Sequence, residues 1–219
     1  MSVIRAIRKD KYYLLLFTQV LFFGILPFIN ESNKLSSIII PVLLGAMMIA
    51  GVNAAYKETK MFNVGVAISF VFAVTIILLE FDKYPLVVLA AFLAFMLFFI
   101  FVIYGIIKML LLTSEVKASL LVGAFSGYLM IGVILTFFLI MLNTFDPHTL
   151  NIPESTMGFG DFLYFSLITM TTIGYGDISP VNPVAQMVSA FSAIISQFYL
   201  AVVVAVIVGK IINAERAKK

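Results

Sequence analysis

Residues 161–177 read DFLYFSLITMTTIGYGD, and this stretch is the most informative part of the chain for its fold. Its first part, Phe162–Met170, is apolar but too short to cross a bilayer, which takes about 20 apolar residues. Its second part carries Gly174 and Gly176, two residues apart. Because glycine adopts positive φ without steric cost, this spacing lets an extended strand turn successive carbonyls toward one axis. Such irregular backbone is tolerated at membrane depth only where it lines a cavity.

The composition around this stretch is that of a membrane protein. Hydrophobic residues make up 63% of the 219 residues and charged residues only 11%, whereas a soluble domain carries about a quarter charged residues. This chain cannot cover itself with a water-facing surface, so we expect it to face lipid. Cysteine is absent, which excludes disulfides, thiolate metal sites and cysteine nucleophiles.

Apolar stretches long enough to span a bilayer recur along the chain. The six predicted spans are Tyr12–Ile29, Ile38–Tyr56, Met61–Leu79, Pro85–Leu112, Ser119–Asn143 and Pro183–Ile212. The segment Thr144–Asn182, between the last two, is too polar and too rich in glycine and proline to span. The first span follows a basic segment, and its length indicates an uncleaved signal anchor rather than a cleaved signal peptide.

The basic residues predict the orientation. With a cytoplasmic N-terminus, only Lys34 and Lys83 of the 14 Lys and Arg residues lie outside, which leaves 14 − 2 = 12 inside, as the positive-inside rule requires. Seven acidic residues gather on the outer side: Glu31, Glu80, Asp82, Asp146, Glu154, Asp161 and Asp177. We therefore expect a multi-pass protein of the plasma membrane with both termini in the cytoplasm.

The motif Thr-x-Gly-Tyr-Gly-Asp at residues 172–177 resembles the signature of the tetrameric potassium channel superfamily, in which it follows a short apolar helix and precedes a final span. The resemblance covers roughly Ser119–Lys210, while the earlier spans match only in number, as in the six-helix branch. It implies an all-α membrane protein with six transmembrane helices, a re-entrant pore helix and a selectivity-filter loop. Since the motif occurs once per chain, a closed ring of filter strands requires several chains, and the resemblance implies a homotetramer.

The resemblance also assigns the ion sites. Backbone carbonyls of Thr172, Ile173, Gly174 and Tyr175, with the Thr172 hydroxyl, would replace the hydration shell of K⁺. Gly176 would shape the outer mouth. The Tyr175 side chain would point away from the axis and pack on the pore helix.

Four residues around the motif would support the filter: Thr171, Asp177, Tyr164 and Phe165. The Tyr164 hydroxyl is our candidate hydrogen-bond donor to Asp177. The pore helix would run over residues 161–170, with Asp161 as its N-cap or first-turn acid and its negative C-terminal end favouring a cation. Ile168 stands where some relatives place a Glu that pairs with the Asp, so we expect weak proton-linked inactivation.

The last span carries the predicted gate. A stripe at helical spacing, Gln197, Leu200, Val204 and Val208, would line the pore, and an apolar constriction there would close by dewetting. The alternative is that this stripe packs on the fifth span. Ser196 stands in the register where relatives often carry a hinge glycine, and we group it with the pore-lining residues without expecting a sharp hinge.

The fourth span lacks the charges of a voltage sensor. Residues 85–107 contain no basic residue, and Lys108 stands alone at the cytoplasmic end. One charge moved through 100 mV supplies about 2.3 kcal/mol, so steep voltage gating needs several charges. We therefore expect a shallow voltage dependence.

Two further features are open to a functional and an ordinary interpretation. Gly123 and Gly127 form a small-xxx-small face that suits close helix contact, although ordinary membrane glycines look the same. His148, the only histidine, lies near Asp146 and Glu154. It is a proton sensor, a metal ligand or a solvated loop residue.

The predicted organisation is a cytoplasmic segment (1–11), a four-helix domain (12–112), a linker (113–118), a pore domain (119–212) and a cytoplasmic tail (213–219). The expected function is passive conduction of K⁺ by a homotetramer in contact with lipid, without cofactor, nucleotide or nucleic acid. No acid, base and nucleophile converge, so we do not expect an enzyme. The alternatives are a non-selective monovalent cation channel, a potassium transporter subunit and a non-conducting membrane scaffold.

Overall fold

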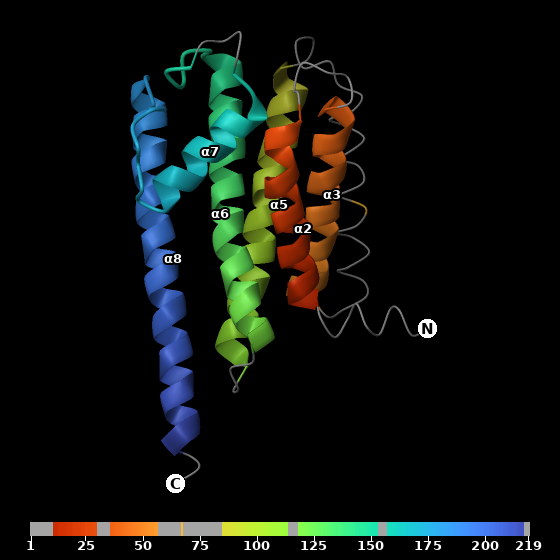
Figure 1. The fold of residues 1–219 in the computed structure, drawn as a ribbon, viewed down its shortest axis with the longest axis vertical. Coiled ribbons are helices and arrows are strands. Elements are labelled where there is room, and N and C mark those ends of the chain that lie inside the picture. Colours follow the sequence, from red (N-terminus) through yellow and green to blue (C-terminus); the bar gives the residue numbers. More distant parts are fainter. Residues whose placement is uncertain are drawn as a thin grey trace. The chain divides into compact units, whose positions relative to one another are not determined.

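The computed structural model describes residues 11–29, 36–56, 67, 85–113, 118–152 and 157–216. The helices in these residues, shown in Figure 1, are α2 (Lys11–Ile25), the 3₁₀ helix η1 (Leu26–Phe28), α3 (Ser36–Ala55), α5 (Pro85–Leu112), α6 (Ala118–Phe145), α7 (Phe159–Met170) and α8 (Pro183–Arg216).

Five segments among the described residues are long and apolar enough to cross a membrane. They are Lys11–Phe28, Ile38–Ala55, Leu89–Leu112, Ala118–Phe145 and Pro183–Arg216. They coincide with five of the six spans predicted from the sequence. The remaining predicted span, Met61–Leu79, lies outside the described residues.

The chain forms two compact units. The first comprises Met1–Leu78, Phe98–Gly127 and Ala201–Lys219, and the second comprises Leu79–Leu97 and Tyr128–Leu200. Helices α5, α6 and α8 each contribute one part to each unit. The predicted division of the chain into a four-helix domain and a pore domain stays a prediction.

In the first unit, helices approach closely at glycines. Helices α2 and α3 lie side by side (Figure 1). A Cβ added at Gly105 of α5 would lie 2.6 Å from the Cβ of Ala55, at the end of α3. Next to this contact, the Tyr56 ring stacks on Phe101 with centroids 4.4 Å apart, and the Tyr56 hydroxyl donates a 2.9 Å hydrogen bond to the Phe101 carbonyl.

Helices α2 and α6 meet through a second glycine and a buried polar pair. A Cβ at Gly123 would lie 2.5 Å from the Tyr12 ring, so Gly123 is in close helix contact, with α2 as the partner. Further along, Gln19 Nε2 donates to the Ser126 carbonyl at 3.0 Å, and both side chains are fully buried. An interhelical hydrogen bond of this kind strengthens packing between apolar helices.

We expect Gly105→Ala to destabilise the first unit. The new Cβ would meet the Ala55 Cβ, which is not the flexible end of a side chain, so the two helices must move apart; overpacking of this kind costs about 1–3 kcal/mol. Thermal unfolding in detergent measures the effect. The matched control is Gly24→Ala, whose Cβ meets nothing within 4 Å. Equal unfolding midpoints for the two variants would contradict this account.

Two lysines of the first unit bind carbonyls at helix C-termini, where the helix dipole favours a cation. Lys11 Nζ donates to the Ala54 carbonyl near the end of α3 at 2.5 Å. Lys210, on α8, binds the end of α5. Its Nζ donates to the carbonyls of Leu110 (2.6 Å), Leu111 (3.0 Å) and Thr113.

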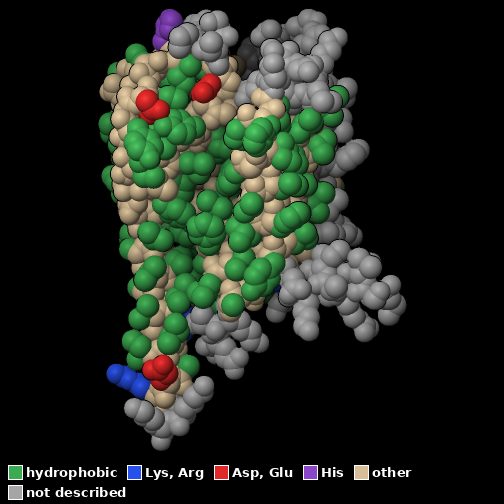
Figure 2. All heavy atoms as spheres, in the orientation of Figure 1, with side chains coloured by type: hydrophobic (Ala, Val, Ile, Leu, Met, Phe, Trp, Pro, Cys, Tyr) green, Lys and Arg blue, Asp and Glu red, His purple; other side chains and the backbone are tan. Residues whose placement is uncertain are grey.

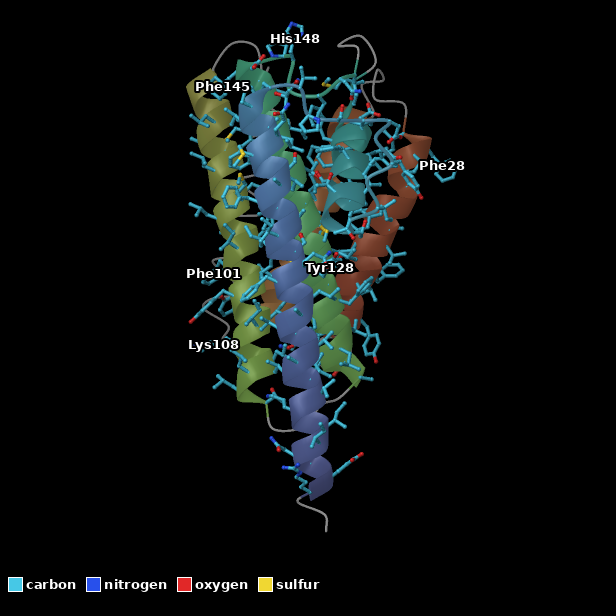
Figure 3. All side chains as sticks on the ribbon, turned by 90° about the vertical axis from the view of Figure 1, so that its left-hand side faces the viewer. Phe28, Phe101, Lys108, Tyr128, Phe145 and His148 are labelled. Carbon is cyan, nitrogen blue, oxygen red and sulfur yellow. The ribbon has the colours of Figure 1, made fainter. Side chains whose placement is uncertain are left out.

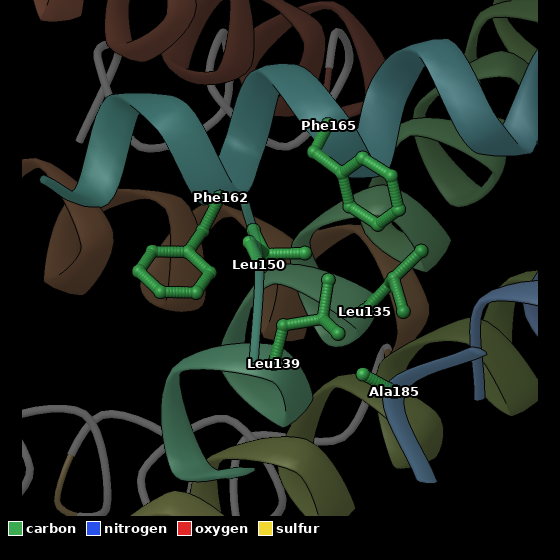
Figure 4. Close-up of a cluster of buried hydrophobic side chains, with 6 residues drawn as sticks. All are labelled: Leu135, Leu139, Leu150, Phe162, Phe165 and Ala185. Carbon is green, nitrogen blue, oxygen red and sulfur yellow. The ribbon is translucent and has the colours of Figure 1, made fainter. Parts of the chain in front are cut away.

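The second unit has an apolar core built between α6, α7, the start of α8 and the loop after α6 (Figure 4). Its buried members are Leu135, Leu139, Leu150, Phe162, Phe165 and Ala185. The loop residue Leu150 also forms an isolated bridge with Pro180, just before α8. Outside such cores the surface is strongly apolar, and Figure 2 shows hydrophobic side chains over much of one face.

Candidate functional site

The short helix α7 forms where the sequence predicted a pore helix. It begins at Phe159, two residues before the predicted start, and ends at Met170 as predicted. Asp161 lies in its first turn, and the Asp161 carboxylate accepts a 2.9 Å hydrogen bond from the backbone N–H of Gly158. An acid at this position satisfies a helix N-terminal donor and opposes the positive end of the helix dipole.

The irregular segment Thr171–Asp177, which follows α7 and which we call the glycine strand, has left-handed backbone at every second residue from Thr172 on. Thr172, Gly174 and Gly176 have φ values of +61°, +53° and +81°, and the residues between them do not have positive φ. Alternation between right- and left-handed conformations turns successive peptide groups the same way. The two glycines were expected to allow this. Thr172 was not, since an L-residue pays about 1–2 kcal/mol for a left-handed conformation.

Carbonyls at the end of α7 accept hydrogen bonds from the first backbone amides of this strand. Thr172 N donates to the Thr169 carbonyl at 3.1 Å, and the amides of Ile173 and Gly174 both donate to the Ile168 carbonyl, at 3.0 and 3.2 Å. These bonds satisfy carbonyls that a helix C-terminus otherwise leaves without a partner. Because its first amides donate to carbonyls of α7, the strand is anchored at the end next to this helix.

The side chains of the strand are exposed. Tyr175 is 71% exposed in the single chain, so the packing of Tyr175 on the pore helix that we expected is not present within one chain. Phe165, which we had also placed near the filter, is buried in the core behind α7, 4% exposed. Phe165 therefore supports α7 from behind rather than contacting the strand from the exposed side.

The predicted hydrogen bond between Tyr164 and Asp177 is present. The Tyr164 hydroxyl donates to Asp177 Oδ2 at 2.7 Å and joins α7 to the far end of the strand. This bond is the main reason why the pKa of Asp177 is lowered and that of Tyr164 is raised from their ordinary values. Because the Asp177 pKa is lowered, the contact is fully present above the ordinary carboxyl pKa and is lost only as the pH falls through the lowered value.

We expect Tyr164→Phe to make the current more sensitive to external acid. Without the hydroxyl donor, the pKa of Asp177 rises toward the ordinary carboxyl range, so Asp177 is protonated at a higher pH. The measurement is the external pH that halves the current in planar bilayers, which should move upward in the variant. The control is Tyr13→Phe, at an exposed tyrosine of α2. A half-blocking pH shared by Tyr164→Phe and the unaltered protein would count against the assignment.

The carbonyl of Met170, the last residue of α7, accepts two side-chain hydrogen bonds. Tyr128, near the middle of α6 (Figure 3), donates through its hydroxyl at 3.0 Å, and Gln197 of α8 donates through Nε2 at 3.2 Å. Gln197 was predicted to line the pore, whereas its amide here binds the end of α7. Tyr128 was not among the predicted site residues. The available signal was a phenol in the middle of an apolar span, where a hydroxyl needs a partner.

The predicted gate stripe on α8 is exposed within the single chain, whereas Ser196, which we grouped with the pore-lining residues, is buried. Leu200, Val204 and Val208 are 44%, 50% and 47% exposed within the single chain. Ser196 is fully buried, and its hydroxyl donates to the Ser192 carbonyl at 2.7 Å. Its side chain therefore does not join the stripe, because it lies on another face of an unbroken helix.

The loop that follows α6 is hydrogen-bonded to the residues just before α8. Asn151 N donates to the Ser179 carbonyl at 3.0 Å, and Asn182 donates to Asp146 at 2.9 Å while its own side-chain oxygen caps α8 at the Ala185 amide. His148 lies at the start of this loop, three residues after Phe145 (Figure 3). Within the described part of the chain no group of three or more His, Cys, Asp or Glu side chains could hold a metal ion, and Glu154 lies outside it.

A family model described as "Ion channel" matches residues 128–213. The matched segment begins at Tyr128 and contains the outer part of α6, all of α7, the glycine strand and nearly all of α8. Residues 128–213 are therefore similar to an ion channel family, and the long apolar helices are those of an integral membrane protein. This similarity points to a channel rather than an enzyme. No curated protein and no solved structure matches the chain.

Proposed function

We propose that the chain is one subunit of a potassium-selective channel that conducts K⁺ passively. The observation that carries the proposal is the left-handed backbone at Thr172, Gly174 and Gly176 in a strand anchored on α7. Alternating backbone of this kind presents a row of carbonyls to one side. A row of carbonyls replaces the hydration shell of a cation when several strands surround one axis.

The ion sites of this proposal are incomplete in a single chain. One strand offers oxygens from one side only, and Tyr175 on that strand is 71% exposed. The most apolar part of α8 is only 17% buried within the chain, whereas that of α6 is 56% buried. We propose that further copies cover these surfaces in a homotetramer, that Tyr175 packs on a neighbouring copy, and that lipid covers the remaining apolar surface.

Selectivity is tested by the reversal potential of the reconstituted protein in mixed K⁺ and Na⁺. A reversal potential close to the K⁺ equilibrium value is the expected result. A value near zero would favour the non-selective cation channel, and a folded protein that passes neither ion would favour the non-conducting scaffold. Mass measurement of the purified oligomer tests the second part of the proposal, and a trimer or a monomer would overturn it.

The orientation and the voltage dependence belong to the same proposal. Both termini would lie in the cytoplasm and the glycine strand would open to the outside, because most basic residues then lie inside. The conductance should change little between −100 and +100 mV, because Lys108 is the only basic residue of α5. One charge that moves through 100 mV supplies only about 2.3 kcal/mol, so steep gating needs several charges. A steep rise of open probability over this range would contradict the proposal.

A further inference from the structure

The Met170 carbonyl differs from the other carbonyls at the end of α7. Three of them accept hydrogen bonds from backbone amides that follow the helix. These are Leu167 (from Thr171), Ile168 (from Ile173 and Gly174) and Thr169 (from Thr172). Met170 instead accepts from two side chains, Tyr128 and Gln197, at 3.0 and 3.2 Å. We call these three groups the Met170 junction.

The α6 side of the Met170 junction is tightly packed. Met170 is fully buried, and a Cβ added at Gly132 of α6 would lie 2.7 Å from its sulfur. The Tyr128 ring lies one turn before Gly132 on the same helix, with its centroid 6.2 Å from that of Tyr199. Close packing of this kind holds the Tyr128 hydroxyl in place, so the α6 donor has little freedom to move.

The α8 side is held differently. Gln197 is exposed, and the most apolar part of its helix is only 17% buried within the chain. Two serines of this helix bond to their own helix backbone: Ser189 donates to the Ala185 carbonyl and Ser196 to the Ser192 carbonyl, both at 2.7 Å. Gln197 reaches across to another element. A side-chain amide in an apolar span is costly unless it is hydrogen-bonded, so this contact is the specific link between α8 and the end of α7.

The Met170 junction lies next to the most strained residue of the strand. Thr172, two positions after Met170, is the only residue other than glycine with positive φ in the described part of the chain. Strained backbone persists where the surrounding structure over-determines it. The junction supplies such restraint immediately before the strand begins.

From these contacts we propose that Gln197 is a positioning residue of the ion filter. Together with Tyr128, it holds the Met170 carbonyl so that Thr172 keeps its left-handed conformation and the innermost ion site keeps its shape. The inference rests on the proposed function, because it concerns the regulation of the same ion site. It gives Gln197 a role that differs from lining the pore.

Two substitutions separate these roles. Gln197→Leu removes the amide donor together with the polarity, whereas Gln197→Glu keeps the size and polarity but has no N–H donor when ionised. A pore-lining role predicts that Gln197→Glu attracts cations and raises the single-channel conductance with unaltered selectivity. A positioning role predicts that both variants lower the K⁺/Na⁺ permeability ratio and shorten the mean open time by about threefold to tenfold or more, since the loss of a single hydrogen bond accounts for that range and the tetramer loses one in each subunit.

The experiment is single-channel recording of the full-length tetramer in planar bilayers, with Gln186→Leu as the matched glutamine control. Gln186 is an α8 glutamine whose side-chain amide donates to the nearby carbonyls of Pro180 and Val181. Tyr128→Phe should act in the same direction as Gln197→Leu, and the double variant should deviate from additivity because both donors share one carbonyl.

An unaltered permeability ratio and open time in conducting Gln197→Leu channels would overturn the inference. If Gln197→Leu does not assemble, the permeability ratio and open time of the Gln197→Glu channel test the inference instead. Failure of the proposed function looks different, because the unaltered protein would then pass no K⁺ or would not discriminate it from Na⁺.

Discussion

Replacing Gly174 by alanine is expected to reduce K⁺ flux at least about a hundredfold while the oligomer still assembles. Gly174 has φ +53°, and nothing lies within 4 Å of the position that a Cβ would take. The penalty is therefore conformational rather than steric within the chain. A left-handed conformation costs an L-residue about 1–2 kcal/mol, and in a tetramer this cost arises in each of the four subunits. The backbone relieves this cost by turning a carbonyl away from the axis, which removes an ion ligand.

The test is rubidium flux into liposomes, with size-exclusion chromatography to establish that the oligomer is intact. Gly24→Ala is the control, because its Cβ also meets nothing within 4 Å but its φ is not positive. D-Alanine at position 174, introduced by chemical ligation, should restore the flux, since a D-residue adopts positive φ at no cost. L-Alanine channels that conduct as well as the control would remove the main support for the filter.

The second large effect is expected for Val204→Asp, which should raise the open probability about tenfold or more. Val204 is half exposed between Leu200 and Val208 on one stripe of α8. If four copies bring these stripes together, the constriction is apolar and closes by losing its water. A ring of carboxylates would keep it hydrated and would hold it open to cations.

Single-channel recording distinguishes this outcome from simple damage. Val204→Ile keeps the stripe apolar and should leave the open probability unaltered. If Val204 instead packs on another helix, the buried carboxylate lowers stability and assembly without opening the channel. An assembled Val204→Asp channel with the open probability of the unaltered protein would rule out a dewetting gate at this position.

The sequence alone determined the features that depend on neighbours along the chain. Hydropathy located five of the described spans to within a few residues, and the short apolar run after Asp161 predicted α7. The glycine spacing predicted the positive φ of Gly174 and Gly176. The contact between Tyr164 and Asp177 was also predictable, since the resemblance places an aromatic pair, Tyr164 and Phe165, on the short helix beside the motif that ends in Asp177.

The tertiary structure decided the features that depend on contacts between elements far apart in the sequence. Tyr128 lies 42 positions from Met170 and Gln197 lies 27 positions from it, and no local pattern identifies such partners. Ser196 and Gln197 are adjacent in the sequence, yet one is buried and the other reaches the end of α7. The physical reason is that periodicity specifies which residues share a helix face, whereas only the packed neighbours decide what each face meets.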